Sequence, residues 1–406
     1  MFCHNGAAKG LILATLCCAI FMGSCGSLSV ISERVPEYLA RQAAVGEYRN
    51  IRFYSDDIDS LKALAQDRIH DLQQAYAGQS FKGRSVNLNY LSISGGGGDG
   101  AFGAGLLNGW TASGARPKFD VVTGISTGAL IAPFAFLGPE YDSVLKHAYT
   151  TTSTADIEDT QPIPALLGLS PSLSSNGAFE RLIASYFTPE VLTAIAAEYR
   201  KGRMLLIGTT NLDAQRAVIW DIGAMAVSGR SDALDLTRRI IMASASIPGV
   251  FPPVRIKVNA DGKTFDELHV DGGVTRQVFL FPPGYDPRLV DAAIGWKPHR
   301  RAFVIRNSMI DAQYEAVDAT ILPIAGRSIS TLIKTQGVGD LYRIFLVSQR
   351  ENVDFNLAYI PYTFKEKAKS MFDPVYMQSL YNFAYEQGSR GYHWHKEPPG
   401  LEPHQN

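Results

Sequence analysis

Short apolar runs alternate with helical segments through the centre of the chain, and this alternation limits the possible folds more than any other feature. Residues 86–93 first alternate and then become wholly apolar, which predicts a strand that enters a core. Helical patterns lie at 100–111, 127–136 and 233–245, and further short apolar runs lie at 119–122, 204–208, 217–220, 268–270 and 302–305. Strands that alternate with helices predict an α/β protein whose mostly parallel sheet is covered on both faces.

The regions on either side of this centre have a different pattern. Residues 26–55 carry little periodic signal and are predicted to be a tether, followed by a helix over 58–76. After residue 310 the pattern is mainly helical, with one strand-like run at 355–360. We therefore divide the chain into a leader (1–24), a tether and N-terminal helix (25–85), a central α/β domain (86–310) and a mainly helical C-terminal extension (311–406).

The N-terminal 25 residues have the pattern of a targeting signal. Lys9 is followed by the apolar run 10–22 and by two small residues before Cys25, and this run is too short to span a bilayer comfortably. Small residues ahead of a cysteine resemble the bacterial lipoprotein signal, although Met22 stands where that signal usually has leucine. The resemblance implies lipidation of Cys25 and a lipid-anchored location at a membrane surface of the bacterial cell envelope, in the outer membrane. An ordinary cleaved secretory leader and an uncleaved anchor are the alternatives.

Charge and cysteine content exclude two classes of function. The chain has 38 basic and 39 acidic residues and a net charge of -1, which argues against a nucleic-acid partner. All four cysteines lie within the first 25 residues, so the remainder can form neither an internal disulfide nor a thiolate metal site.

A G-x-S-x-G sequence follows one of the predicted strands. It runs from Gly124 to Gly128, with Ser126 at its centre, and the apolar helix-like run 129–132 comes next. A nucleophile elbow needs this context of strand, sharp turn and helix, because the turn exposes the serine hydroxyl and leaves no room for flanking side chains. The pattern also occurs by chance in glycine-rich chains, so its position carries the argument.

A run of glycines ends the first predicted strand of the centre. Gly95, Gly96, Gly97 and Gly98 lie between Ser94 and Asp99, and consecutive glycines let successive N–H groups point at one spot. Near a nucleophile, such a loop serves as an oxyanion hole. Residues 98–103 also fit the dinucleotide pattern G-x-G-x-x-G. That pattern needs an acidic residue at the end of the next strand, whereas Asp120 precedes the apolar part of that strand.

A third motif places a carboxylate at a strand end. Asp271 follows the apolar run 268–270 and precedes Gly272 and Gly273, which form a turn. In parallel-sheet proteins, reactive residues gather beyond the carboxyl ends of strands. A carboxylate within hydrogen-bonding reach of a serine can accept its proton directly.

These three motifs, in this order, resemble the patatin-like phospholipase family, whose members use a Ser-Asp dyad. The resemblance extends through 208–213 and 244–253 and covers about residues 86 to 290. It implies a three-layer α/β/α fold with flanking helices, Ser126 as nucleophile and Asp271 as base. It also implies an oxyanion hole formed by the N–H groups around Gly96, Gly97 and Gly98, and chemistry that needs no metal and no organic cofactor.

Two positions depart from the family pattern. The family's glycine loop usually begins with Asp and carries Lys or Arg before its last glycine, where this chain has Ser94 and Asp99. The backbone donors should survive both changes, but a negative Asp99 near a developing oxyanion would be unfavourable unless it points away or is paired.

Histidines decide between a dyad and a Ser-His-Asp triad. His299, His393 and His395 lie late enough in the chain to serve a triad, but we expect each to be an exposed or packed side chain. His393 and His395 alone are a weak metal signal, because no third ligand accompanies them. His269 is expected to be a neighbour of the site and not a catalytic member.

The function that the resemblance implies is hydrolysis of fatty-acyl esters in lipids, including phospholipids, by a serine acyl hydrolase. Two alternatives stay open: a lipid acyltransferase, in which a lipid alcohol replaces water, and a non-catalytic lipid-binding envelope protein of the same fold. The partners expected are a lipid acyl-ester substrate and a membrane surface.

Overall fold

The computed structural model of the 406-residue chain describes residues 33–75, 87–157, 159–160, 174–282, 284 and 286–401. The predicted leader and Cys25 lie outside the described residues.

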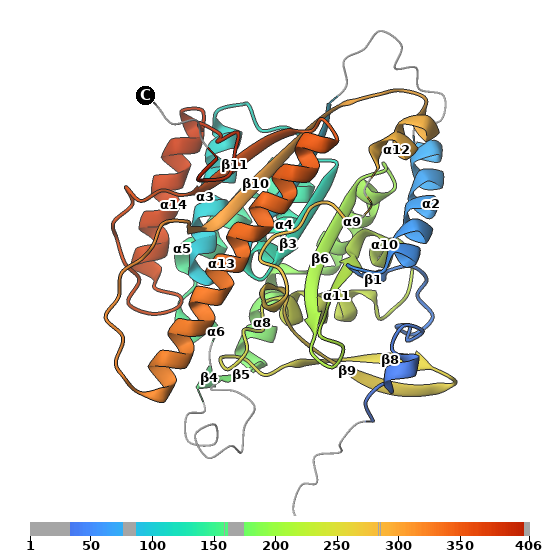
Figure 1. Cartoon of the computed structure of the whole chain (residues 1–406), viewed down its shortest axis with the longest axis horizontal. Coiled ribbons are helices and arrows are strands. Elements are labelled where there is room, and N and C mark those ends of the chain that lie inside the picture. Colours follow the sequence, from blue (N-terminus) through green and yellow to red (C-terminus); the bar gives the residue numbers. More distant parts are fainter. Residues whose placement is uncertain are drawn as a thin grey trace, which may run out of the picture.

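A twisted sheet forms the centre of the molecule (Figure 1). Within the described residues it has nine strands, and β6, β3, β2, β10 and β11 run parallel in that order. Strands β7, β1 and β9 join antiparallel, and β8 pairs with β9 to form a hairpin. The strands are β1 (Arg52–Tyr54), β2 (Asn87–Ile93), β3 (Val121–Ile125), β6 (Met204–Asn211), β7 (Arg216–Asp221), β8 (Val254–Ala260), β9 (Lys263–Asp271), β10 (His299–Met309) and β11 (Asp354–Ile360).

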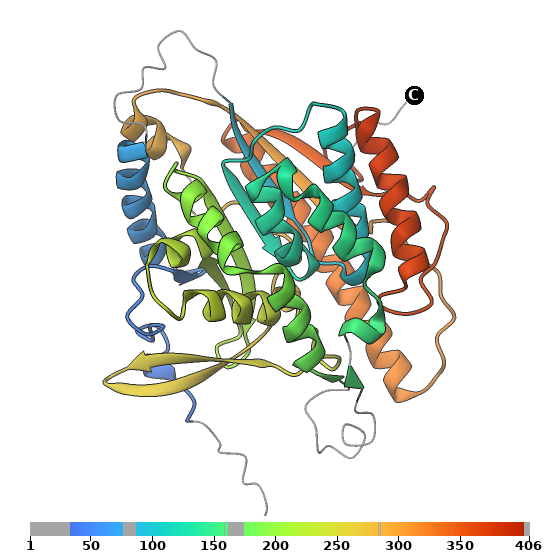
Figure 2. The ribbon, with the colours of Figure 1, turned by 180° about the vertical axis from the view of Figure 1, so that it is seen from behind.

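Helices cover both faces of this sheet, which confirms the predicted mostly parallel α/β architecture with flanking helices. Figure 1 views the sheet from the side of α2 (Ile58–Ala75), α12 (Pro287–Ile294) and α13 (Ile321–Arg350). Figure 2 views the other layer, which contains the main hydrophobic cluster. That layer comprises α3 (Gly100–Ala112), α4 (Thr127–Leu137), α5 (Asp142–Thr151), α6 (Thr154–Ile157), α8 (Gly177–Tyr186), α9 (Pro189–Tyr199), α10 (Ile222–Val227), α11 (Ala233–Ser244) and α14 (Pro374–Ser389). Short elements complete the described chain: β4 (Asp159–Thr160), β5 (Ser174–Ser175) and the 3-10 turns η1 (Glu37–Leu39), η2 (Gly97–Asp99), η3 (Pro139–Tyr141) and η4 (Gly272–Val274).

The register of the strands brings the three motifs together at one end of the strands. Ile93, at the end of β2, lies opposite Gly124 of β3, and Gly124 lies opposite Ile207 of β6. Asp271, at the end of β9, lies opposite Thr209 of the same strand β6. Ile93 and Asp271 are about 180 residues apart in the sequence, yet the strands that they end finish close together.

Residues 33–54 differ from the predicted tether, because they pack against the domain. Leu39, Tyr48 and Ile51 are buried, and β1 pairs with β7. Arg52 of β1 also forms an ion pair with the buried Glu267. Residues 33–54 lie along other elements and form no regular amphipathic face of their own. Their sequence therefore shows no periodicity.

The residues after 310 contribute to the same core as the central domain. Strand β11 pairs in parallel with β10, and α14 packs along α3. The two helices approach so closely that a Cβ on Gly105 or Gly109 would lie 2.2 Å from the carbonyl oxygen of Tyr381 or Tyr385. The glycines of α3 therefore make room for α14. Among the described helices, none is both long enough and apolar enough to cross a bilayer.

Candidate active site

Ser126 occupies a strained turn between β3 and α4. Its φ of 55° and ψ of -125° lie outside the regions that non-glycine residues normally adopt. The flanking glycines explain how the turn can be so sharp. A Cβ on Gly124 would lie 2.3 Å from the carbonyl oxygen of Gly128, and one on Gly128 would lie 2.2 Å from that of Ile93. Only glycine fits at either position without moving the backbone.

The structure brings Ser126 and Asp271 together. The Ser126 hydroxyl lies near enough to the Asp271 carboxylate to favour its ionised form, as a hydroxyl that faces a carboxylate does. Asp271 Oδ1 also accepts the N–H of Gly273 at 2.7 Å, so the η4 turn fixes the orientation of the carboxylate. Each residue is only 5% exposed. Burial raises the pKa of Asp271 to about 6, while the Ser126 hydroxyl and the N–H of Gly273 oppose this rise.

The C-terminal end of α11 and the residues that follow it connect Ser126 and Asp271. The N–H of Ser126 donates to Ser244 Oγ at 3.1 Å, and the Ser244 hydroxyl in turn donates to the carbonyl of Gly208 at 2.6 Å. Two residues later, the carbonyl of Ser246 accepts the N–H of Asp271 at 2.9 Å. This short segment therefore fixes the backbone on both sides of the Ser126–Asp271 contact.

The glycine loop passes directly beside Ser126. A Cβ on Gly95 would lie 3.1 Å from the Cβ of Ser126, so a larger residue there would press on the serine. Gly97 has a φ of 57° and lines the same pocket as Ser126. Within the described part of the chain, the N–H groups of Gly96, Gly97 and Gly98 donate to no protein acceptor. Backbone donors left free beside a serine are the arrangement that an oxyanion requires.

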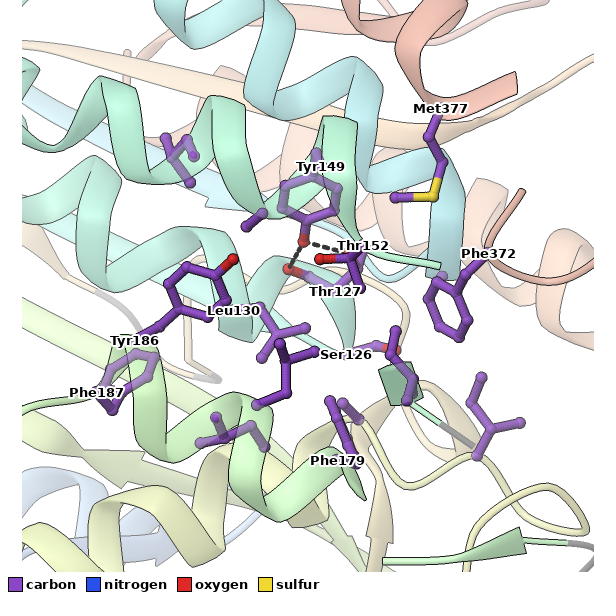
Figure 3. Close-up of a pocket in the computed structure, with 18 of the residues that line it drawn as sticks. Ser126, Thr127, Leu130, Tyr149, Thr152, Phe179, Tyr186, Phe187, Phe372 and Met377 are labelled. Carbon is purple, nitrogen blue, oxygen red and sulfur yellow. Dashed lines mark hydrogen bonds between the residues drawn. The ribbon is translucent and has the colours of Figure 1, made fainter. Parts of the chain in front are cut away.

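A narrow apolar pocket of about 70 Å³ leads away from Ser126 (Figure 3). None of the described residues that line it is charged. The Tyr149 hydroxyl lies 2.5 Å from that of Thr127, which holds Tyr149 against the first turn of α4. Aromatic and aliphatic side chains from five helices, from the segments after α8 and α11 and from the segment before α14 form the walls of the pocket, among them Leu130, Leu145, Phe179, Tyr186, Phe187 and Phe372.

A comparison with protein families found a match over the part of the chain that forms this site. Residues 91–282, which contain the glycine loop, Ser126 and Asp271, match the model of the patatin-like phospholipase family. This part of the chain is similar to a patatin-like phospholipase domain. Members of this family are typically lipid acyl hydrolases.

A comparison with solved structures found similarity to VipD from Legionella pneumophila. The similarity covers 75% of this chain and 66% of VipD, with 12% sequence identity and a TM-score of 0.31. This chain therefore spans slightly less than two thirds of that protein. The comparison with curated proteins found no match.

The two departures from the patatin-like pattern have local explanations. Asp99 points toward Tyr376, whose hydroxyl donates to its Oδ1 at 2.7 Å, and the charge of the nearby Arg306 favours its ionised form. Burial outweighs both effects and raises the pKa of Asp99 to about 6. Ser94 holds the loop to β10, because its Oγ accepts the N–H of Asn307 at 2.9 Å and its hydroxyl donates to the carbonyl of Gly95 at 2.7 Å.

Gln277 is a residue of this site that the sequence analysis missed. Its backbone carbonyl accepts the N–H of Gly95, and its side-chain amide donates to the carbonyl of Gly273 at 3.1 Å. Its Oε1 accepts a hydrogen bond from Arg306 at 3.3 Å. Gln277 therefore connects the glycine loop to the turn that holds Asp271. No sequence motif marks Gln277 as a site residue, because all of its hydrogen-bond partners except Gly273 lie far from it in the sequence.

His269 points into a separate hydrogen-bond network. Thr209 Oγ1 accepts a hydrogen bond from Trp220 and lies 2.9 Å from His269 Nδ1, to which it donates when the ring is neutral and its other nitrogen carries the proton. The other ring nitrogen then donates to Glu267 at 3.1 Å. Burial lowers the pKa of His269, which favours this neutral form. His269 is thus a structural neighbour of the site.

The remaining candidate histidines lie outside the pocket. His299, His393 and His395 are not among the described residues that line the cavity beside Ser126. His299 begins β10, at the end of the strand opposite to Asn307, and His395 packs against Tyr359 of β11. Among the described residues, Asp271 is the carboxylate whose pKa the Ser126 hydroxyl lowers.

Proposed function

We propose that this protein hydrolyses fatty-acyl esters of lipids, with Ser126 as the nucleophile and Asp271 as the general base. The proposal rests mainly on one observation: the Ser126 hydroxyl, which lines an uncharged, apolar pocket, lies beside the Asp271 carboxylate, and both residues are almost fully buried.

The chemistry follows from these positions. Ser126 Oγ attacks the acyl carbonyl carbon while its proton passes to Asp271, which gives a tetrahedral intermediate. The intermediate collapses and expels the alcohol, which takes the proton from Asp271 and leaves the fatty acyl group on Ser126. Water then attacks the acyl-enzyme with Asp271 again as base, and the fatty acid leaves. A base with a pKa of about 6 is ionised at neutral pH and can still accept a proton.

The glycine loop supplies the electrostatic part of the mechanism. The free N–H groups of Gly96, Gly97 and Gly98 are available to the oxygen that becomes negative in the intermediate. Each such preorganised donor contributes about 2.7 to 4 kcal/mol to transition-state stabilisation. The Asp99 carboxylate accepts a hydrogen bond from Tyr376 and therefore points away from this oxygen.

The pocket favours an acyl chain over a polar substituent. Its walls are aromatic and aliphatic, and a charged or strongly hydrated group would lose its water there without a partner. The volume of about 70 Å³ leaves little spare space, so a long chain has to displace lining side chains or extend beyond the pocket.

Hydrolysis of chromogenic acyl esters by purified protein tests this proposal. Ser126→Ala should abolish turnover and leave the fold intact, whereas Ser185→Ala, which changes an exposed serine on α8, should leave turnover unchanged. Full activity of the Ser126→Ala protein would refute the proposed nucleophile.

Product analysis separates the alternative functions. Mass spectrometry of lipid vesicles incubated with the protein should show free fatty acid that depends on Ser126. Transfer of the acyl group to an added lipid alcohol would indicate an acyltransferase. Lipid binding without any Ser126-dependent product would indicate a binding protein. Lipidation of Cys25 and a location in the cell envelope also stay proposals, and the mass of the mature N-terminal peptide tests them.

A further inference from the structure

A second cavity lies on the other side of the sheet from Ser126. Successive residues of a strand point to opposite faces, and in β6 Leu205 and Ile207 belong to the main core, whereas Met204 and Leu206 face α2. Between α2, α12 and this face, a cavity of about 350 Å³ remains. We call it the α2 cavity. It has five times the volume of the pocket beside Ser126 and falls within the usual range of ligand sites.

The walls of the α2 cavity are mainly apolar. The sheet contributes Met204, Leu206 and Ile219, while α2 contributes Leu61 and Ile69. Protein cores are normally packed with few voids larger than a water molecule. Apolar side chains from several elements that converge without filling the space between them indicate a site for an apolar ligand.

One cation on the wall has no bonding partner among the residues that the structure describes. Arg276 is half-buried and lines the α2 cavity, and its side chain forms no hydrogen bond or ion pair with any residue that the structure describes. Burial and the charge of Arg343 lower the pKa of Arg276, and Asp340 and Asp56 oppose this effect. Asp340 accepts the N–H groups of Gln277 and Val278, and Asp56 pairs with Arg216.

The other charged residues of the wall are already engaged. Lys62 pairs with Asp59, Arg68 with Asp71, and Asp286 with Arg288, while Asp120 accepts the N–H of Asn89. The α2 cavity thus combines a long apolar wall with one available arginine. An apolar chain with a single anionic end complements both features, because arginine binds carboxylates through paired hydrogen bonds.

We propose that the α2 cavity binds one long-chain fatty acid anion, with its carboxylate on Arg276 and its chain along Met204, Leu206 and Ile219. This site is separate from the proposed active site and needs no catalysis. It goes beyond the proposed function, because occupancy depends on Arg276 and the apolar wall and not on Ser126.

Photo-crosslinking with site mapping tests this proposal directly. The full-length protein is irradiated with increasing concentrations of a palmitic acid analogue that carries a diazirine on its chain, and the labelled peptides are quantified by mass spectrometry. Labelling should saturate on α2 and on residues 276–290, and it should be unchanged in the Ser126→Ala protein. A long-chain alcohol with the same diazirine should label these peptides at least about tenfold less efficiently, because it lacks the charge-assisted bond.

Two variants and one control sharpen the test. Arg276→Gln should raise the half-saturating concentration at the α2 cavity about tenfold or more. Ala65→Trp, at an exposed position of α2 that lines the cavity, should fill the space and abolish labelling there. Arg200→Gln, an exposed arginine outside the cavity, should have no effect. Circular dichroism checks that each variant is folded.

The pattern of labelling decides whether the α2 cavity is the proposed binding site. Labels confined to the pocket beside Ser126, or equal labelling in Arg276→Gln and Arg200→Gln, would overturn the proposed site. Ester hydrolysis is not measured in this experiment, so a failure of the proposed enzyme function would leave the labelling of the α2 cavity unchanged.

Discussion

Asp271→Asn should abolish activity and at the same time make the protein more stable at neutral pH. The substitution keeps the shape of the side chain, and its oxygen can still accept the N–H of Gly273, but it removes the negative charge and the basic group. As a general base, Asp271 should contribute about 100-fold to 10,000-fold to the rate, and this factor should be lost from kcat.

The gain in stability follows from the pKa of Asp271. Burial raises this pKa from 3.8 to about 6, which corresponds to about 3 kcal/mol. Because the folded protein favours the protonated form, stability falls as the pH rises from about 4 to 6, and the full cost is present above 6. Asparagine carries no charge, so the variant avoids this cost at pH 7.5 and has no such advantage at pH 4.

Thermal unfolding and ester hydrolysis measure the two effects together. At pH 7.5 the Asp271→Asn protein should unfold several degrees higher than the unmodified protein, and this difference should disappear toward pH 4. Ser126→Ala is the matched control, since it removes activity but leaves the buried charge in place. An Asp271→Asn protein that hydrolyses esters within tenfold of the normal rate would refute the role of Asp271 as base. A variant that is less stable at pH 7.5 would refute the electrostatic argument.

Four further predictions follow from the site. The kcat/KM for a neutral ester should rise with pH through about 6 and then level off, as Asp271 ionises; a flat profile between pH 5 and 7 would contradict this. Gly128→Ala should destabilise the protein by about 1 to 3 kcal/mol in denaturant unfolding, because its Cβ would meet the carbonyl of Ile93, whereas Gly339→Ala in open space on α13 should not. Gln277→Ala should lower kcat more than it changes KM in steady-state kinetics, because it frees the glycine loop from the Asp271 turn; an unchanged kcat would exclude this positioning role. Ala148→Phe should shift the preference toward shorter acyl esters in a chain-length series, since Ala148 lines the pocket beside Ser126.

Local patterns were sufficient to predict most of the central sheet. The apolar run at 86–93 is β2, the run at 204–208 is the start of β6, and the helix expected at 100–111 is α3. These elements are fully or largely buried, so their composition follows from their environment. The hairpin strand β8 was missed, although its burial alternates residue by residue and a period-two pattern was available in the sequence.

The candidate site was predictable only in part, for a physical reason. Ser126, Asp271 and the loop glycines belong to short motifs whose backbone geometry demands particular residues. Gln277, Asn307 and Tyr376 act through contacts that are mostly with residues far away in the chain, and no local pattern marks such contacts. The same reason explains why the packing of residues 33–54 was not foreseen: β1 is a strand because it meets β7, not because of its own periodicity.

Covalent labelling with an alkyl fluorophosphonate tests the central claim most directly, because this probe reacts with a serine only when its hydroxyl is activated. Peptide mass spectrometry of the labelled protein should locate a single adduct on Ser126, formed much more slowly in the Asp271→Asn protein and absent from the Ser126→Ala protein. An adduct on another serine, or labelling of Ser126 at the same rate without Asp271, would contradict the account.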